Sequence, residues 1–274
     1  MTVRLVSYNI RFGGRRRREL IADVLRVTEP DIVVLQEAVD PAVVAWLGSE
    51  LNLPHVVAES GRSVAALSRI PIADAVWHAA RRGRSFLELR LDEQDLHVFG
   101  VHLTAGLSGR GERRRAVEAE QLLRRVTAIP DGGQRSILVG DFNAIAPGDG
   151  PSVARLPMWI RILLRVDGGI RNEVMSRLFE AGFVDAHRAL HPTEPGFTMP
   201  AIAPSVRLDY ALIGPGLVDT LRACAPLSVV DPAAPGAPGS AGPSGSGSSE
   251  SDFVLSMALP LASDHLPLVT VLDV

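Results

Sequence analysis

The sequence predicts an α/β fold in which two layered β-sheets are covered by helices. Apolar runs of β type alternate with amphipathic helical segments along the 274 residues, a pattern typical of α/β proteins. Two of the β-type runs, Phe86–Leu91 and Leu96–His102, follow each other as in a hairpin. Because a hairpin implies antiparallel pairing, the pattern favours mixed layered sheets over a purely parallel, doubly wound sheet.

The period of the apolar residues predicts each element in turn. Strands are expected at Val3–Ile10, Ile32–Gln36, Val64–Ser68, Phe86–Leu91, Leu96–His102, Ser136–Gly140, Tyr210–Ile213 and Leu268–Leu272, where apolar residues alternate or run continuously. Amphipathic or well-delimited helices are expected at Glu19–Thr28, Pro41–Leu51, Arg113–Ala128 and Asn172–Ala181. Gly182 follows the last of these helices as a stop signal.

We expect one domain over residues 1–274 with a single insertion. Residues 231–252 are rich in Pro, Gly, Ser and Ala and have no apolar period, which predicts a disordered surface loop; a tether or lid is the alternative. No apolar run reaches the about 18 residues of a membrane span, and the first residues do not resemble a signal peptide. We therefore expect a cytoplasmic protein without stable membrane insertion, and nothing in the sequence indicates a protein partner.

Composition narrows the classes of function. The net charge is −3, which is not the strongly basic balance of many nucleic-acid-binding domains. The chain contains no Lys, so all 28 basic residues are Arg; a GC-rich genome would explain this, although Arg is also the better bidentate phosphate binder. The single cysteine, Cys224, excludes an internal disulfide and a cysteine-based zinc site.

Polar side chains suited to metal binding stand at the ends of the first two predicted strands. Glu37 closes the run DIVVLQE, and Asn9 interrupts SYNIRF. A charge directly after a buried strand has to emerge at the sheet edge or be paired, so Glu37 could hold a hard divalent cation with Asn9 beside it. A simple strand-end glutamate and a capping asparagine are the alternatives.

Asp141, Asn143 and His102 follow two further β-type runs. Asp141 and Asn143 stand two apart after ILVG, so they point to the same side of an extended segment, and Gly140 permits a tight backbone before them. Asp141 can position or deprotonate water, while Asn143 can donate to a phosphoryl oxygen; an ordinary turn is the alternative. His102, in HVFGVHL, would add an imidazole to the same cleft or serve a structural role.

The last polar cluster combines two carboxylates and an imidazole. Asp264 and His265 place a metal ligand and a general acid or base side by side. Asp209 interrupts an apolar strand in RLDYAL, where a carboxylate is costly unless it is paired. Orienting an imidazole would satisfy it, and an ion pair with Arg207 is the alternative.

The ordered motifs SYNIR, LQE, VHL, GDFNA, RLDY and SDHLP resemble those of the endonuclease/exonuclease/phosphatase superfamily, which has the DNase I-like fold. The resemblance runs from Val3 to Val271 and implies a four-layer α/β sandwich of two packed mixed β-sheets flanked by helices. It also implies Mg²⁺, or alternatively Mn²⁺, as the cofactor. One departure is Arg11, because some nuclease branches carry an acidic residue two positions after the Asn.

The resemblance assigns a role to each site residue. Glu37 would be the principal metal ligand, with Asn9 beside it and Asp264 as a further ligand. Asp141 would position the attacking water. The remaining residues would contact the phosphate, directly or through a neighbour: Asn143, His102, and His265 oriented by Asp209.

The predicted function is that of a divalent-metal-dependent phosphoesterase that hydrolyses phosphodiester bonds, with a nuclease as the leading interpretation. Three basic runs stand at 15–18, at 81, 82 and 84, and at 110 and 113–115. The first and third could bind a polyanionic backbone near the cleft, although they could equally be solvated surface. The alternatives are a lipid or inositol phosphate phosphoesterase and a non-catalytic binding member of the fold. Met158–Val166 reads as a packed helix, or as a membrane-surface segment that would favour a lipid substrate.

Overall fold

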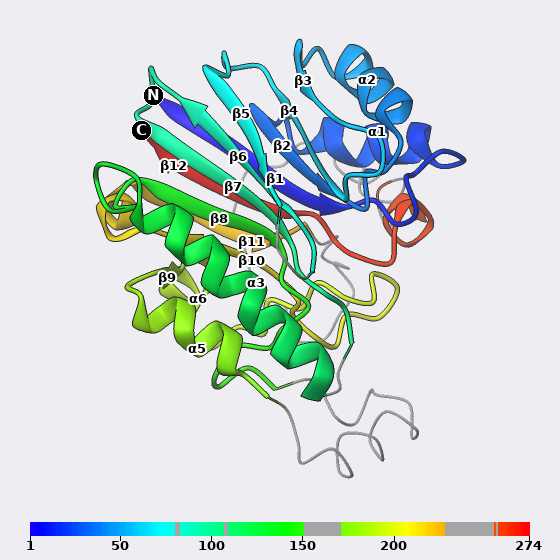
Figure 1. Cartoon of the computed structure of the whole chain (residues 1–274). Helices are drawn as coiled ribbons and strands as arrows, with labels where there is room; N and C mark the ends of the chain where they lie inside the picture. The colour runs from blue at the N-terminus through cyan, green and yellow to red at the C-terminus, as the bar shows by residue number, and fades with distance from the viewer. Residues whose placement is uncertain (80–82, 107–108, 151–170, 228–254, 256) are drawn as a thin grey trace, which may run out of the picture.

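In a computed structural model, which describes residues 1–79, 83–106, 109–150, 171–227, 255 and 257–274, two six-stranded sheets pack face to face (Figure 1). The first sheet has the order β11-β12-β1-β2-β4-β3, and the second has the order β5-β6-β7-β8-β10-β9. The strands are β1 (Thr2–Asn9), β2 (Ile32–Gln36), β3 (His55–Val57), β4 (Val64–Ser68), β5 (Asp74–His78), β6 (Phe86–Leu91), β7 (Leu96–His102), β8 (Ser136–Asp141), β9 (Val184–Asp185), β10 (Asp209–Ile213), β11 (Leu221–Pro226) and β12 (Leu268–Asp273).

Helices cover the outer faces of both sheets. They are α1 (Arg18–Val27), α2 (Pro41–Glu50), α3 (Gly109–Thr127), α5 (Glu173–Glu180) and α6 (Ala186–Leu190), with a 3₁₀ segment, η2, at Pro215–Thr220. One apolar cluster fills the space between the sheets, a second lies between the first sheet and α1 and α2, and a third lies between the second sheet and α3 and α5. The predicted four-layer sandwich is confirmed.

Alternation along β1 shows why its sequence is apolar on both sides. Val3 and Leu5 belong to the cluster between the sheets, whereas Val6 and Tyr8 belong to the cluster beneath the helices. Successive side chains of a strand point to opposite faces, so a strand in the middle layers buries both faces. At about 25 cal/mol per Å² of buried apolar surface, these layers are the main source of stability.

Glycine permits two close approaches that matter for the site. A Cβ on Gly100 would lie 2.8 Å from side-chain carbons of Val34 and Val64 in the opposite sheet, so this glycine lets the two sheets meet. Gly140 has φ +146°, and a Cβ there would lie 1.9 Å from the carbonyl oxygen of Val101. Any larger residue would push β8 away from β7 one position before Asp141.

The sheet topology brings the ends of several strands to one edge. The pairs β1–β2 and β7–β8 are parallel, so Gln36 lies beside Asn9 and Asp141 beside His102. Strand β10 is antiparallel to β8, with Asp209 opposite Asp141. Strand β12 is antiparallel to β1 and begins opposite Ser7, so the residues just before β12 also reach this edge.

All eight predicted strands and all four predicted helices are present, with shifts at their ends. Helix α3 begins at Gly109, four residues before the expected start at Arg113, and its first turn contains two glycines, which are poor helix formers. The short edge strands β3, β5, β9 and β11 were not predicted. The expected loop at 231–252 and the segment Met158–Val166 lie outside the described residues. None of the helices that the structure describes is long and apolar enough to cross a membrane.

Candidate active site

Asn9, Glu37 and Asp141 bring the two sheets together at the shared edge. The side-chain Nδ2 of Asn9 lies 3.1 Å from Oδ2 of Asp141 and 3.5 Å from Oε1 of Glu37. Asn9 ends β1, Glu37 follows β2, and Asp141 ends β8 in the other sheet. Two carboxylates from different sheets therefore converge on one amide group.

The loop after β1 wraps around Glu37. The backbone N–H of Phe12 donates to Oε2 of Glu37 at 2.7 Å, and the N–H of Gly13 donates to its carbonyl oxygen at 2.9 Å. Arg11, Phe12 and Glu37 all have φ near +50°, a backbone conformation that non-glycine residues adopt rarely. These contacts fix the carboxylate of Glu37 at the end of the strand.

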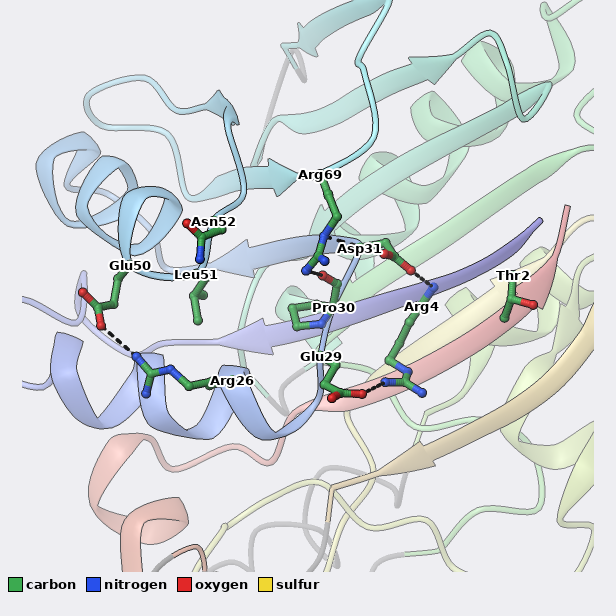
Figure 2. A pocket seen from close by; sticks show the side chains of 10 residues that line it. All are labelled: Thr2, Arg4, Arg26, Glu29, Pro30, Asp31, Glu50, Leu51, Asn52 and Arg69. Carbon is green, nitrogen blue, oxygen red and sulfur yellow. Dashed lines mark hydrogen bonds and ion pairs between the residues drawn. The ribbon is translucent and has the colours of Figure 1, made fainter.

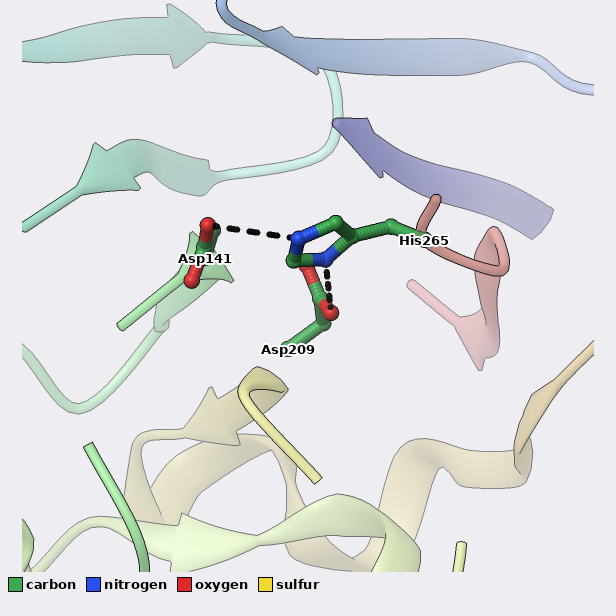
Figure 3. Close-up of side chains that lie close together, drawn as sticks. All are labelled: Asp141, Asp209 and His265. Carbon is green, nitrogen blue, oxygen red and sulfur yellow. Dashed lines mark hydrogen bonds and ion pairs between the residues drawn. The ribbon is translucent and has the colours of Figure 1, made fainter. Parts of the chain in front are cut away.

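Asp209 and His265 form a buried pair beside Asp141 (Figure 3). The imidazole Nδ1 of His265 lies 2.8 Å from Oδ2 of Asp209, and its Nε2 faces Oδ2 of Asp141 at 3.9 Å. Asp209 is 1% exposed and His265 is 5% exposed. Thr198 supports the pair from behind, because its hydroxyl accepts the backbone N–H groups of Leu208 and Asp209.

His102 approaches Asp141 from another side. Its Nε2 lies 3.7 Å from Oδ2 of Asp141 and accepts a hydrogen bond from the guanidinium of Arg84. A guanidinium can only donate, so the proton of the imidazole remains on Nδ1, which faces the hydroxyl of Ser63 at 2.5 Å. His102 is therefore held as a neutral imidazole.

The two imidazoles have opposite electrostatic surroundings. Burial opposes a charge on His265, but Asp209, Asp141 and Asp264 outweigh it and raise its pKa to about 10. Burial, followed by the charges of Arg84 and His265, holds the pKa of His102 well below its usual value. Burial and the neighbouring charge of Asp209 raise the pKa of Asp141.

Asp264 lies at the rim of the site and is half-buried. Its Oδ2 lies 3.5 Å from Nε of Arg11, while the adjacent Ser263 donates to the carbonyl oxygen of Asn9 at 2.6 Å. Arg17 joins the same two loops, because its guanidinium donates to the carbonyl oxygens of Ala262 and Arg11. Asp264 thus reaches the cluster through its neighbours rather than by direct contact with Glu37.

Asn143 follows Asp141 in a left-handed conformation, with φ +48°. The expected extended segment through both residues is wrong, because β8 ends at Asp141 and the chain turns there. Its backbone N–H donates to Oδ1 of Asp141 at 2.9 Å, and its Nδ2 donates to the carbonyl oxygen of Leu103 at 3.2 Å. One of the two side-chain N–H groups is used in this contact, so the half-buried amide keeps a second donor.

A family model described as the Endonuclease/Exonuclease/phosphatase family matches residues 6–265. The chain belongs to the endonuclease/exonuclease/phosphatase family. No curated protein sequence matches the chain significantly. Endonucleases, exonucleases and phosphatases all hydrolyse phosphoesters. The enzyme class expected from the sequence, a phosphoric ester hydrolase, is therefore confirmed.

Solved structures agree with this assignment at the level of the fold. The chain resembles the 3′ phosphatase NExo from Neisseria, solved with a product DNA hairpin, with a TM-score of 0.68 and 18% identity over 99% of this chain and 100% of that one. An AP endonuclease from Archaeoglobus fulgidus gives a TM-score of 0.66 and 20% identity over the same shares. The 3′–5′ exonuclease NExo from Neisseria meningitidis gives 0.68 and 18%, again over 99% and 100%.

The polar groups around Asn9 suit a hard cation. Glu37 and Asp141 both face the amide of Asn9, so oxygen ligands meet where a positive charge is favourable, and such ligands are those that Mg²⁺ prefers. Asp141, Asp209 and His265 also lie within 4.8 Å of one another through one ligand atom each and could hold a metal ion. This group of three residues is less suited to Mg²⁺, which prefers oxygen ligands. Its imidazole offers only nitrogen, and Nδ1 of His265 already engages Asp209.

The local sequence left the partner of Asp209 open between an imidazole and Arg207, and the structure decides between them. Arg207 pairs with Asp149 at 2.5 Å and with Asp185, whereas Asp209 pairs with His265. The alternative ion pair between Arg207 and Asp209 is not formed.

Arg84 and Ser63 were not predicted as site residues. The register of the β6–β7 hairpin pairs Leu87 with Gly100; continued by two residues, it places Ser85 opposite His102 and Arg84 beside it. The hairpin seen in the sequence thus contained the signal for Arg84. Ser63 reaches His102 from the other sheet, and no local pattern indicates such a contact.

Proposed function

We propose that this protein is a divalent-metal-dependent phosphodiesterase that cleaves nucleic acid, with Mg²⁺ as the preferred ion. The observation that carries the proposal is the arrangement around Asp141. A carboxylate of raised pKa stands between a charged imidazole, His265, and a neutral one, His102, at 3.9 and 3.7 Å.

The cofactor would be held by Glu37 and Asn9, with Asp264 at the rim. When bound, a hard cation neutralises the phosphate and stabilises the charge that develops on the leaving oxygen. The carboxylate of Glu37, which lies 3.5 Å from the side-chain amide of Asn9 at the same strand end, supports this assignment. Arg11 competes for Asp264, since its guanidinium lies 3.5 Å from that carboxylate.

Asp141 orients the attacking water and accepts its proton. A general base works best when its pKa is close to the working pH, and burial moves the pKa of Asp141 in that direction. Asn9 and the backbone N–H of Asn143 hold the two carboxylate oxygens in place.

The remaining side chains bind the phosphate. His265 presents a charged Nε2–H towards Asp141, because Asp209 engages its other nitrogen. Preorganised donors of this kind stabilise developing negative charge without reorganisation. Arg84, at His102, and the free amide donor of Asn143 complete the set.

A lipid phosphodiester is the second candidate. Phe12 is 79% exposed and Ile202 is 81% exposed, and each stands next to a residue that contacts Asp264, namely Arg11 and Ala201. Apolar side chains at the mouth of a site are suited to contact with acyl chains or a membrane surface.

The test is a divalent-dependent activity screen. Substrates are nicked duplex DNA, single-stranded DNA, RNA, bis-p-nitrophenyl phosphate and sphingomyelin vesicles, each assayed with Mg²⁺, Mn²⁺ and EDTA. We expect hydrolysis of nucleic acid that EDTA abolishes, and a loss of about two decades or more in Glu37→Gln. Glu50→Gln, the same change on an exposed helix, is the control. Full activity of Glu37→Gln at limiting Mg²⁺ contradicts the metal assignment, and turnover of vesicles alone favours the lipid candidate.

A further inference from the structure

A basic groove runs beside the active site along the first turns of α3. It has a volume of about 590 Å³ and is lined by Gly83, Thr104, Arg110, Arg113, Arg114 and Val117. Arg110, Arg113, Arg114 and Val117 stand at helical spacings of three and four residues and so share one exposed face of the helix. The opposite face of α3 is buried against the second sheet.

The three groove arginines have no acidic partner among the residues that the structure describes. None of them makes an ion pair with another residue that the structure describes, and all three are exposed. A second, larger cavity of about 660 Å³ at the opposite edge of the first sheet provides the contrast (Figure 2). There Arg4 pairs with Glu29 and Arg26 with Glu50, so its positive charge is largely cancelled.

A buried carboxylate joins the floor of the groove to the active site. Glu118, which is 1% exposed, accepts the backbone N–H groups of Thr104 and Arg84 at 2.8 Å each, as well as the hydroxyl of Thr104. Arg84 in turn donates to His102, and Thr104 follows His102 by two residues. Glu118 therefore links the groove residue Thr104 to the active-site residue His102 through Arg84.

We propose that Arg110, Arg113 and Arg114 bind successive phosphates of the nucleic-acid strand whose scissile phosphate lies in the active site. The inference rests on the proposed function and specifies it, because uncompensated positive charge selects a polyanion over a substrate with a single phosphate. The arginines span about 6 Å of helix at 1.5 Å per residue. The helix N-terminus adds partial positive charge at the same end. Among the described residues that line the groove, Val117 is the sole apolar side chain.

The test measures binding without turnover. Fluorescence anisotropy with labelled single-stranded and duplex oligonucleotides in EDTA gives Kd between 50 and 200 mM salt for the wild type and for the triple variant Arg110→Gln, Arg113→Gln, Arg114→Gln. The matched control is Arg26→Gln, Arg124→Gln, Arg222→Gln, which removes the same charge from side chains that are 50%, 75% and 52% exposed elsewhere. Circular dichroism checks that both variants are folded, and Arg113→Gln alone replaces the triple variant if it is not.

Loss of three phosphate contacts lowers the slope of log Kd against log salt by about 2 for single strands and nearly 3 for duplex. We expect this in the groove variant only, with its hydrolysis of bis-p-nitrophenyl phosphate unchanged. A slope equal to that of the control overturns the proposal while leaving the phosphodiesterase intact. Absence of EDTA-sensitive nucleic-acid hydrolysis in the wild type contradicts the proposed function instead. If the groove variant loses binding to phosphatidylserine vesicles but keeps its oligonucleotide affinity, the groove serves a membrane and the proposal is wrong.

Discussion

His265 and His102 face the same carboxylate from two sides, yet their surroundings make His265 a cation and keep His102 neutral. Their Nε2 atoms lie 3.9 and 3.7 Å from Asp141, and both rings are almost fully buried. His265 has Asp209 at its other nitrogen, and its pKa is raised to about 10. His102 has Arg84 at Nε2, and its pKa is lowered.

The comparison shows that burial alone does not set the charge of an imidazole. Burial disfavours the charged form of both rings, so the sign of the nearest partner decides the outcome. One strand-end histidine becomes a fixed cation for the phosphate, and the other stays neutral and carries a cation, Arg84, beside it. The site thus has positive charge on both flanks of Asp141 from different residues.

The largest effect is expected from Asp209→Asn. The change removes the charge that keeps His265 protonated, so burial then lowers the pKa of the ring. Because the imidazolium exists only below its pKa, the alkaline limb of the pH–rate profile should move to lower pH, and the rate at neutral pH should fall by about 10²–10⁴. NMR titration of the ring and pH–rate profiles measure both. A profile that keeps its alkaline limb in a folded variant contradicts the assigned charge of His265.

A smaller effect is expected from Arg84→Leu. Without the guanidinium, the pKa of His102 should rise towards its usual value, although burial still opposes the charge. The loss of a charged hydrogen-bond donor should lower kcat/KM about 10–100-fold. Arg84→Lys keeps the charge and should recover part of the rate. If His102 titrates unchanged in Arg84→Leu, the guanidinium does not set its charge state.

The smallest effect is expected from Ser63→Ala. The variant removes the hydroxyl that faces Nδ1 of His102 at 2.5 Å and leaves Arg84 in place. One such hydrogen bond contributes about 1 kcal/mol, or about fivefold in rate. Steady-state kinetics together with thermal unfolding separate this loss from a loss of folding. A decrease comparable to that of Arg84→Leu would mean that the tautomer, rather than the cation, matters most on this side.

The sequence predicted the central strands, which are buried on both faces. Runs such as ILVG before Asp141 have few alternatives to a central strand, because their apolar side chains need partners on both sides. The edge strand β5 (DAVWH) is exposed or half-buried along its length, so its sequence carries no comparable signal. The early start of α3 was missed because its first four residues, GRGE, contain two glycines and no apolar residue of a helical period.

The site was predictable where chemistry coincides with a strand end. Asn9, Glu37, Asp141 and His102 follow from that rule, and the structure places them in one cluster. The local pattern left the partner of Asp209 open, because Asp209 stands two residues from Arg207 and far in sequence from His265, and only the family resemblance implied the imidazole. The decision came from tertiary structure, where Asp149 and Asp185 engage Arg207.

The most direct test of the account is a double-mutant cycle on Asp209 and His265. The claim is that the carboxylate acts through the imidazole and has no separate role in turnover. Rates on duplex DNA with saturating Mg²⁺ are measured for the wild type, Asp209→Asn, His265→Ala and the double variant, with urea unfolding of each in parallel. If the claim is right, the double variant is about as slow as the slower single variant, since residues that share one function are strongly non-additive. If the two rate losses multiply in folded proteins, Asp209 and His265 act independently and the charged pair is not the phosphate-binding unit.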